Sequence, residues 1–271
     1  RRHRTDGRAG LMRGAVIAAI LAVAASPAVA QDAGDDWDLT VDEAHNMMLA
    51  TVGYSSGQAI AVRCREGDLD VLISGLPPME GAGRRIETAY ADGRVESGLW
   101  LAAGNGALIF SPAPRLDARR LRQGGPLQLS VALESPPAGP LRRFALDLPA
   151  RSVNLDQVLE ACGEGRPDPR DDLIRWTQPD GMTDLWRRQP APMYPEAAVH
   201  LGAGFATFSC VVAEGGRLTD CRTERESHAR RYGFGESAMR SLRDARVAPA
   251  DEGGPPVGML LLGTIRFRIA S

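Results

Sequence analysis

The chain has 271 residues, and its 32 basic residues, all arginines, nearly balance its 34 acidic ones. This length is enough for two domains of ordinary size, each with its own hydrophobic core. Residues 1–30 hold five arginines and one aspartate, so the remaining chain carries 27 arginines against 33 acids, a net charge near −6. That charge argues against nucleic acid as a partner.

The first candidate element is the apolar segment 15–25, which follows Met12-Arg13. It has about half of the ~20 residues that a membrane-spanning helix needs. Small residues stand three positions and one position before Gln31, at Ala28 and Ala30. This pattern predicts a signal peptide over residues 12–30, cleaved after Ala30, and therefore a periplasmic protein. The alternative is an uncleaved leader that anchors the chain in the inner membrane, which is the one case in which we expect membrane contact.

Residues 36–163 are rich in strand patterns, in which β-branched and other apolar residues lie between glycine and proline turns. The segments are residues 59–65, 69–73, 84–90, 98–102, 107–110, 127–133 and 144–148. Strands at this spacing predict a mainly antiparallel domain, either a sandwich or a small barrel. Residues 40–43 resemble a capping box that would open a helix through Met48, although a strand fits this segment nearly as well.

A helix is predicted near the end of this domain, because Leu155, Val158, Leu159 and Cys162 recur at helical spacing. Cysteines of an exported chain are expected to form disulfides. We therefore predict a bridge between Cys64 and Cys162, which closes a loop of about a hundred residues. A metal site is not indicated, since the sequence has no Cys-x-x-Cys or His-x-His spacing.

Residues 164–189 combine prolines with charges and are predicted to be a surface linker. Two short apolar segments interrupt them, at residues 173–176 and at Leu185-Trp186. Their tryptophans could pin the linker to one of the domains, or they could begin the C-terminal domain.

The C-terminal region starts with a predicted hairpin, in which residues 205–212 and 218–223 are strands joined by Gly215-Gly216. Folding the chain symmetrically about this turn sets Cys210 opposite Cys221. If the turn is a four-residue loop, the two cysteines fall at a non-hydrogen-bonded site, where opposite residues lie within disulfide range, so we predict a second bridge here. A two-residue turn would instead make them a hydrogen-bonded pair, which suits a bridge less well.

A helix and a long strand follow the hairpin. The helix is indicated by apolar residues at the 3.6-residue period, namely Phe234, Ala238, Met239, Leu242 and Ala245. Pro249 ends this segment, and residues 259–269 then alternate as a strand.

This order of elements resembles the C-terminal domain of the TonB family, over about residues 184–271. The matching residues are Tyr194-Pro195, Ala197-Ala198, Gly202-Ala203-Gly204, Gly215-Gly216, Phe234-Gly235, Ala238, Leu242, Ala248-Pro249 and Ile265-Arg266-Phe267. The resemblance implies a two-layer ββαβ domain, here residues 190–271, whose sheet edge accepts an extended peptide from an outer-membrane transporter. Some relatives belong to other envelope assemblies. Together with the first domain, the fold class is α+β.

The resemblance to a full energy transducer is incomplete, because such a protein has an uncleaved anchor and a long proline-rich spacer. Here the apolar segment is short, and a β-rich domain stands where the spacer should be. We therefore expect a non-enzymatic envelope protein that binds an extended peptide or an envelope partner. The alternatives are a membrane-anchored transducer for outer-membrane transporters and a periplasmic enzyme with its site in the N-terminal domain.

The candidate partner-binding residues are Tyr194, Pro195, Ile265, Arg266, Phe267 and Arg268. If the last strand lies at a sheet edge, its backbone offers a register for an extended peptide, and its arginines attract acidic segments. The alternatives are that these charges only protect the edge from aggregation, and that Tyr194-Pro195 is a rigid turn. No catalytic residue, metal ligand or cofactor site is predicted, because the histidines are scattered and no phosphate-binding glycine motif occurs.

Overall fold

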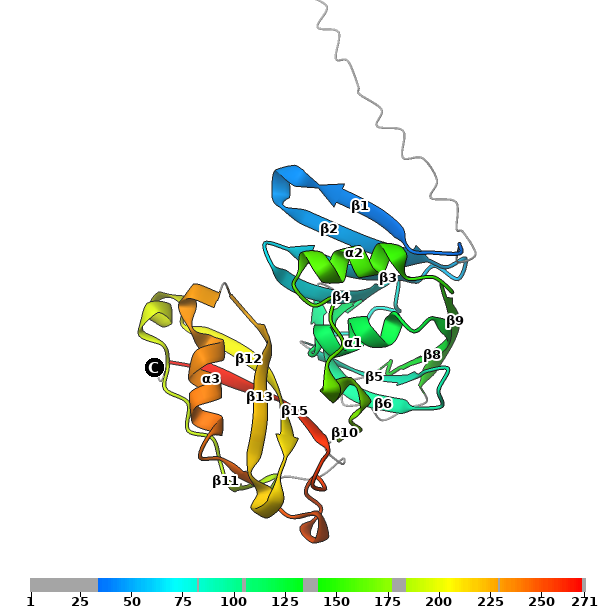
Figure 1. The fold of residues 1–271 in the computed structure, drawn as a ribbon. Coiled ribbons are helices and arrows are strands. Elements are labelled where there is room, and N and C mark those ends of the chain that lie inside the picture. The colour runs from blue at the N-terminus through cyan, green and yellow to red at the C-terminus, as the bar shows by residue number, and fades with distance from the viewer. Residues whose placement is uncertain are drawn as a thin grey trace, which may run out of the picture.

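The structure is a computed structural model that describes residues 34–81, 83–103, 106–133, 141–176, 184–228 and 230–269. The predicted leader, residues 12–30, and its cleavage site after Ala30 lie outside the described residues. Two separate apolar cores are present, one formed within residues 37–162 and the other within residues 176–267. The α+β class predicted from the sequence is confirmed (Figure 1).

The described residues of the N-terminal domain form one antiparallel sheet of nine strands, in the order β1-β2-β3-β4-β7-β6-β5-β8-β9. The strands are β1 (Asp38–Asp42), β2 (Met47–Gly53), β3 (Ala59–Arg65), β4 (Asp68–Ser74), β5 (Gly83–Ala89), β6 (Val95–Ala103), β7 (Leu108–Phe110), β8 (Gly125–Val131) and β9 (Arg142–Leu148). The sequence left a sandwich and a barrel open. The described residues of this domain form a single continuous sheet with β1 and β9 at its two ends.

The segment that could have opened a helix belongs to the first hairpin. Asp42 ends β1, a short 3-10 turn Glu43–His45 follows, and Asp42 pairs with Met47 at the start of β2. The Asp42 carboxylate accepts the backbone N–H of His45, so it caps one turn but not a longer helix. The helix interpretation of residues 40–48 is therefore wrong, because cross-strand pairing outweighs the capping signal.

Two helices complete the N-terminal core, α1 (Pro114–Leu121) and α2 (Val153–Ala161). Helix α2 places Leu155, Val158 and Leu159 in the core, which confirms the helical spacing seen in the sequence. Cys162 follows α2 directly and is bonded to Cys64 of β3, with 5.6 Å between their Cα atoms. This bridge ties the last helix of the domain to β3, the third strand from one edge of the sheet.

The C-terminal domain has the predicted ββαβ order and two layers (Figure 1). Strands β12 (Ala203–Val212), β13 (Leu218–Glu226) and β15 (Leu260–Arg268) form its sheet, and α3 (Phe234–Leu242) covers one face. A short strand from the predicted linker, β10 (Arg175–Trp176), extends this sheet in the order β10-β15-β12-β13. A separate pair joins β11 (Trp186–Arg188) to β14 (Arg246–Val247).

Cys210 and Cys221 are bonded across the β12–β13 hairpin, with 4.1 Å between their Cα atoms. The pairing is the one that symmetric folding about Gly215-Gly216 indicates. None of the helices formed by the described residues has the length and hydropathy needed to cross a membrane.

Candidate partner-binding site

The predicted partner strand, β15, has one edge fully paired and the other paired only at its start. Strand β12 runs antiparallel along its inner edge, from Ala203 opposite Arg268 to Val211 opposite Leu260. On the outer edge β10 runs parallel, with Arg175 opposite Leu260 and Trp176 opposite Leu261. Beyond Leu261 no strand of the described residues pairs with this outer edge.

The outer edge of β15 presents a regular set of backbone groups. The N–H of Leu260 donates to the carbonyl oxygen of Ile174, 2.9 Å away. Backbone groups of successive strand residues point alternately to the two sides. The amides and carbonyls of Leu262, Thr264 and Arg266 are therefore directed to the same outer edge as those of Leu260.

The four predicted residues at the end of β15 have two different environments. Ile265 and Phe267 are buried in the core beneath α3, so their side chains support the strand and do not reach its surface. Arg266 and Arg268 are exposed on the opposite face and form no ion pair with any described residue. Of the four side chains, only the arginines are placed to contact a partner.

Tyr194 and Pro195 form the entry to the domain. The Tyr194 hydroxyl donates to the carbonyl oxygen of Ala198, 3.1 Å away, and its ring packs edge-on against Phe234 and Phe267. Pro195, with φ of −67°, precedes the 3-10 helix Glu196–Leu201. These contacts match the rigid-turn interpretation, in which the two residues position the domain's first turn.

The sheet face opposite α3 docks on the N-terminal domain. The Thr207 hydroxyl donates to the carbonyl oxygen of Pro112, and Arg115 donates to that of Thr223, each over 2.8 Å. A small apolar cluster of Ala113, Leu116 and Leu260 joins α1 to β15. A polar sheet face that would otherwise meet water is thus an interface between the domains.

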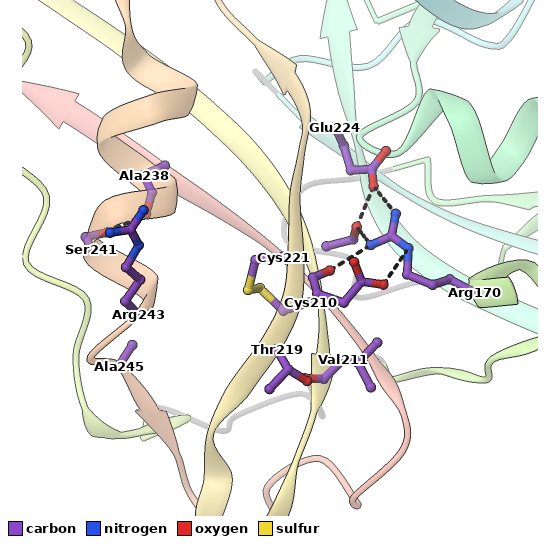
Figure 2. The surroundings of a disulfide bond; sticks show 12 residues. Arg170, Cys210, Val211, Thr219, Cys221, Glu224, Ala238, Ser241, Arg243 and Ala245 are labelled. Carbon is purple, nitrogen blue, oxygen red and sulfur yellow. Dashed lines mark hydrogen bonds and ion pairs between the residues drawn. A yellow bond between two sulfur atoms is a disulfide. The ribbon is translucent and has the colours of Figure 1, made fainter. Parts of the chain in front are cut away.

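A buried arginine from the predicted linker is held by irregularities in the hairpin. Strand β13 has two β-bulges against β12, which leave Glu224 and the Asp220-Cys221 pair out of register. Arg170 donates to the hydroxyl of Ser209 over 2.8 Å and to the carbonyl oxygen of Asp220 over 3.1 Å, and its Nη2 lies 3.4 Å from Oε1 of Glu224. Figure 2 shows Arg170 on the side of the hairpin away from α3. The bulges therefore direct hydrogen-bond acceptors of the hairpin toward one guanidinium group, that of Arg170.

Asp168 connects this arginine to both domains. Its carboxylate contacts Arg119 of α1 and Arg222 of β13, and it also accepts the backbone N–H of Arg170 over 3.0 Å. Burial alone would raise the pKa of Asp168, but the backbone N–H of Arg170 and the guanidinium of Arg222 outweigh it and lower that pKa. Asp168 is therefore held as an anion between the two domains.

A second arginine of the same segment points into the N-terminal domain. Nη1 of Arg175 lies 2.5 Å from Asp117 of α1 and 2.9 Å from Glu96 of β6. Burial and the nearby Asp117 raise the pKa of Glu96, whereas the two carboxylates together overcome burial and raise the pKa of Arg175. We call residues 168–176 the clasp, because they are fixed to both domains by these contacts.

A polar cavity of about 340 Å³ lies between the domains, where β3 and β4 face the end of β13. Asp70 of β4 bridges Arg63 of β3 and Arg225 of β13 at its wall. Since acidic and basic side chains are both abundant in the lining, the cavity has no clear charge preference. The described residues contain no group of three side chains placed to hold a metal ion.

The three described histidines have no catalytic partner of the kind sought in the sequence, although His228 lines the cavity. His45 contacts Asp42 on the surface, with 2.7 Å between Nδ1 and Oδ2. His200 and His228 pack their rings against Tyr232.

The C-terminal part of the chain is similar to a solution NMR structure of the TonB C-terminal domain of Pseudomonas aeruginosa, at 21% identity over 34% of this chain and 93% of that chain, with a TM-score of 0.28. No curated protein matches. The family model described as Gram-negative bacterial TonB protein C-terminal matches residues 190–269.

Proposed function

Since residues 190–269 form a TonB C-terminal domain, as the sequence predicted, we propose that this chain is a periplasmic, non-enzymatic envelope protein that binds an extended segment of a partner along the outer edge of β15. The family match supports an association with the cell envelope and outer-membrane transport. The single observation that carries the proposed site is the set of outward-facing backbone groups between Leu262 and Arg268, on the edge of β15 opposite β12, with which no other described strand pairs.

Strand addition explains how this edge would bind without a pocket. A partner segment would exchange main-chain hydrogen bonds with Leu262, Thr264 and Arg266, each contributing about 0.5–1.5 kcal/mol net. Arg266 and Arg268 would then select acidic side chains and accelerate association. Ile265 and Phe267 would hold the strand rigid by packing beneath α3.

The N-terminal domain fixes the sheet and leaves the far part of this edge accessible, where Thr264, Arg266 and Arg268 are exposed. It docks on the face opposite α3 through Thr207, Ser209 and the clasp, so it stiffens the three main strands from one side. We propose that the first domain, residues 36–163, acts as a rigid support in the place where a transducer has a spacer. The proposed location is the periplasm, after cleavage of residues 12–30 at Ala30.

Amide chemical shifts of the isotope-labelled full chain test this proposal. Synthetic peptides that copy the N-terminal segments of the source bacterium's outer-membrane transporters are added one by one. We expect the largest shifts at Leu262, Thr264 and Arg266. Shifts confined to α3 or to the N-terminal sheet, or no shifts with any peptide, would contradict the proposed site.

Charge reversal gives a matched pair of variants. Arg266→Glu is expected to weaken binding of an acidic peptide by about tenfold, because a like charge replaces an attractive one at the edge. Arg243→Glu, an exposed arginine that follows α3 in the other layer, is the control and should leave the affinity unchanged.

A further inference from the structure

The outer edge of β15 already holds one strand, and that strand comes from this chain. β10 consists of Arg175 and Trp176, and it pairs in parallel with Leu260 and Leu261. It thus occupies the start of the edge at which the proposed partner would add.

The contacts that keep β10 paired with β15 come mainly from one side chain, that of Arg175. Ile174, whose carbonyl oxygen accepts the N–H of Leu260, is 61% exposed and makes little side-chain packing. The side chain of Arg175 is only 11% exposed and lies between the carboxylates of Glu96 and Asp117. Two paired residues give few backbone hydrogen bonds, so the charged contacts of Arg175 dominate.

The acidic pair is built to hold a guanidinium. The Ser111 hydroxyl donates to Asp117, and Nε of Arg120 lies 3.5 Å from Oε1 of Glu96. Each carboxylate is therefore held in position by a second residue of the N-terminal domain. Glu96 keeps its second oxygen, Oε2, turned toward Arg175 at 2.9 Å. Both carboxylates come from the N-terminal domain, whereas the paired backbone comes from the C-terminal domain.

The next residue along the strand faces the other way. Trp176 packs against the C-terminal core, whereas Arg175 reaches the N-terminal domain. Successive side chains of a strand point to opposite faces. The N-terminal domain therefore contacts one side chain of a bound segment, and the C-terminal core contacts the next. The residues that fit are a basic one followed by an aromatic one.

We propose that the start of the β15 edge, with Glu96 and Asp117, is a subsite for an arginine–aromatic pair in a parallel extended segment, and that β10 occupies it until a partner segment bearing the same pair exchanges with it. This inference rests on the proposed function, because it names the kind of segment that the same edge takes. It also makes the N-terminal domain part of the binding site, since that domain supplies both carboxylates.

The test uses the chain's own strand as a probe. A fluorescent synthetic peptide of residues 171–176 is titrated into the full chain and into its Arg175→Ala variant, which frees the two carboxylates. We expect the variant to bind this peptide about tenfold or more tightly than the unchanged chain does. The same variant should bind the Arg175→Ala form of the peptide about tenfold more weakly.

A second variant covers a failure of Arg175→Ala to fold. Trp176→Ala keeps Arg175, Glu96 and Asp117 and removes the aromatic contact that also holds β10, so it should bind the probe more tightly than the unchanged chain does, but by less than Arg175→Ala does. Circular dichroism verifies that each variant is folded. Equal binding to the unchanged chain and the variants, equal binding of the two peptides, or no binding to either variant would each overturn the inference.

Failure of this inference would be distinguishable from failure of the proposed function. If transporter peptides shift Leu262, Thr264 and Arg266 while the probe does not bind, the edge binds partners but the arginine subsite is wrong. If the probe binds selectively and no transporter peptide does, the subsite stands and the class of partner is wrong.

Discussion

Arg170 and Ser209 are hydrogen-bonded across 39 positions of the chain, with 2.8 Å between Nη1 and Oγ. This contact fixes the segment between the domains to the back of the β12–β13 hairpin. Because Glu224 is fully buried beside the same guanidinium, the interface depends on this one side chain remaining in place. A segment predicted to be a surface linker is therefore a structural part of the interface between the domains.

The first prediction concerns removal of this arginine. Arg170→Ala is expected to lower the free energy of unfolding by about 3–5 kcal/mol, because it leaves the carboxylate of Glu224 buried without its cation. Urea unfolding followed by tryptophan fluorescence measures the change.

An exposed ion pair provides the control for Arg170→Ala. Arg187 and Glu252 pair at the surface, where both side chains are more than half exposed. Arg187→Ala should lower the free energy of unfolding by less than about 1 kcal/mol. Equal costs for the two variants would show that the Arg170 contacts do not hold the domains together.

The second prediction compares the two disulfides. Cys64 and Cys162 are 98 positions apart, whereas Cys210 and Cys221 are 11 apart. In the chain-entropy account, replacing both cysteines of the long-range bridge by alanine should lower the free energy of unfolding by about 4–5 kcal/mol. The same replacement at the hairpin bridge should lower it by about 3 kcal/mol. Thermal unfolding of the two double variants checks the order, and a larger loss for the hairpin bridge would contradict it.

The third prediction concerns packing beneath the partner strand. A Cβ at Gly263 of β15 would lie 2.4 Å from the ring of Phe208, which is itself buried. Gly263→Ala should therefore destabilise the C-terminal domain by about 1–3 kcal/mol through overpacking. Gly98 of β6 has open space around its Cβ position, so Gly98→Ala is the matched control, expected within about 0.5 kcal/mol of the unchanged chain.

The fourth prediction concerns pH. The pKa of Asp168 is lower in the folded chain than its ordinary value of 3.8, because the backbone N–H of Arg170 and the charge of Arg222 outweigh burial. A lowered pKa means that the ionised form stabilises the folded state fully above about pH 4 and that this contribution is lost as the pH falls through the folded value. Stability should therefore decline below about pH 4.

Substitution of the carboxylate isolates its share of the pH effect. Asp168→Asn should flatten the acid decline in unfolding free energy, measured by urea unfolding from about pH 5 to pH 2. Asp251→Asn, at an exposed aspartate, should leave the decline unchanged. An acid decline that is identical in Asp168→Asn and the unchanged chain would refute this role.

The fifth prediction concerns processing. The protein isolated from its native envelope should begin at Gln31, and full reduction should add one hydrogen to each sulfur of the two bridges. Intact mass before and after reduction measures both features. A chain that retains residues 12–30 would instead favour the membrane-anchored transducer.

The sequence by itself determined many of the local elements and their order, although the first hairpin and the short strand β10 were not among them. Apolar spacing located the helices around Leu155 and Phe234, and the glycine turn at Gly215-Gly216 set Cys210 opposite Cys221. These features depend on neighbours along the chain, whose backbone and side-chain preferences are local. The ββαβ order and the family resemblance follow from the same short-range patterns.

Only the tertiary structure decided how distant segments meet. The sequence does not show that Arg170 enters the bulges of β13, that Arg175 reaches Glu96 and Asp117, or that β10 lies on the edge of β15. In the sequence these arginines belong to a charged, proline-containing segment, and an isolated charge gives no signal of its partner. Their burial is stable only because carboxylates far apart in the chain converge on each guanidinium, and that convergence is a property of the packed domains.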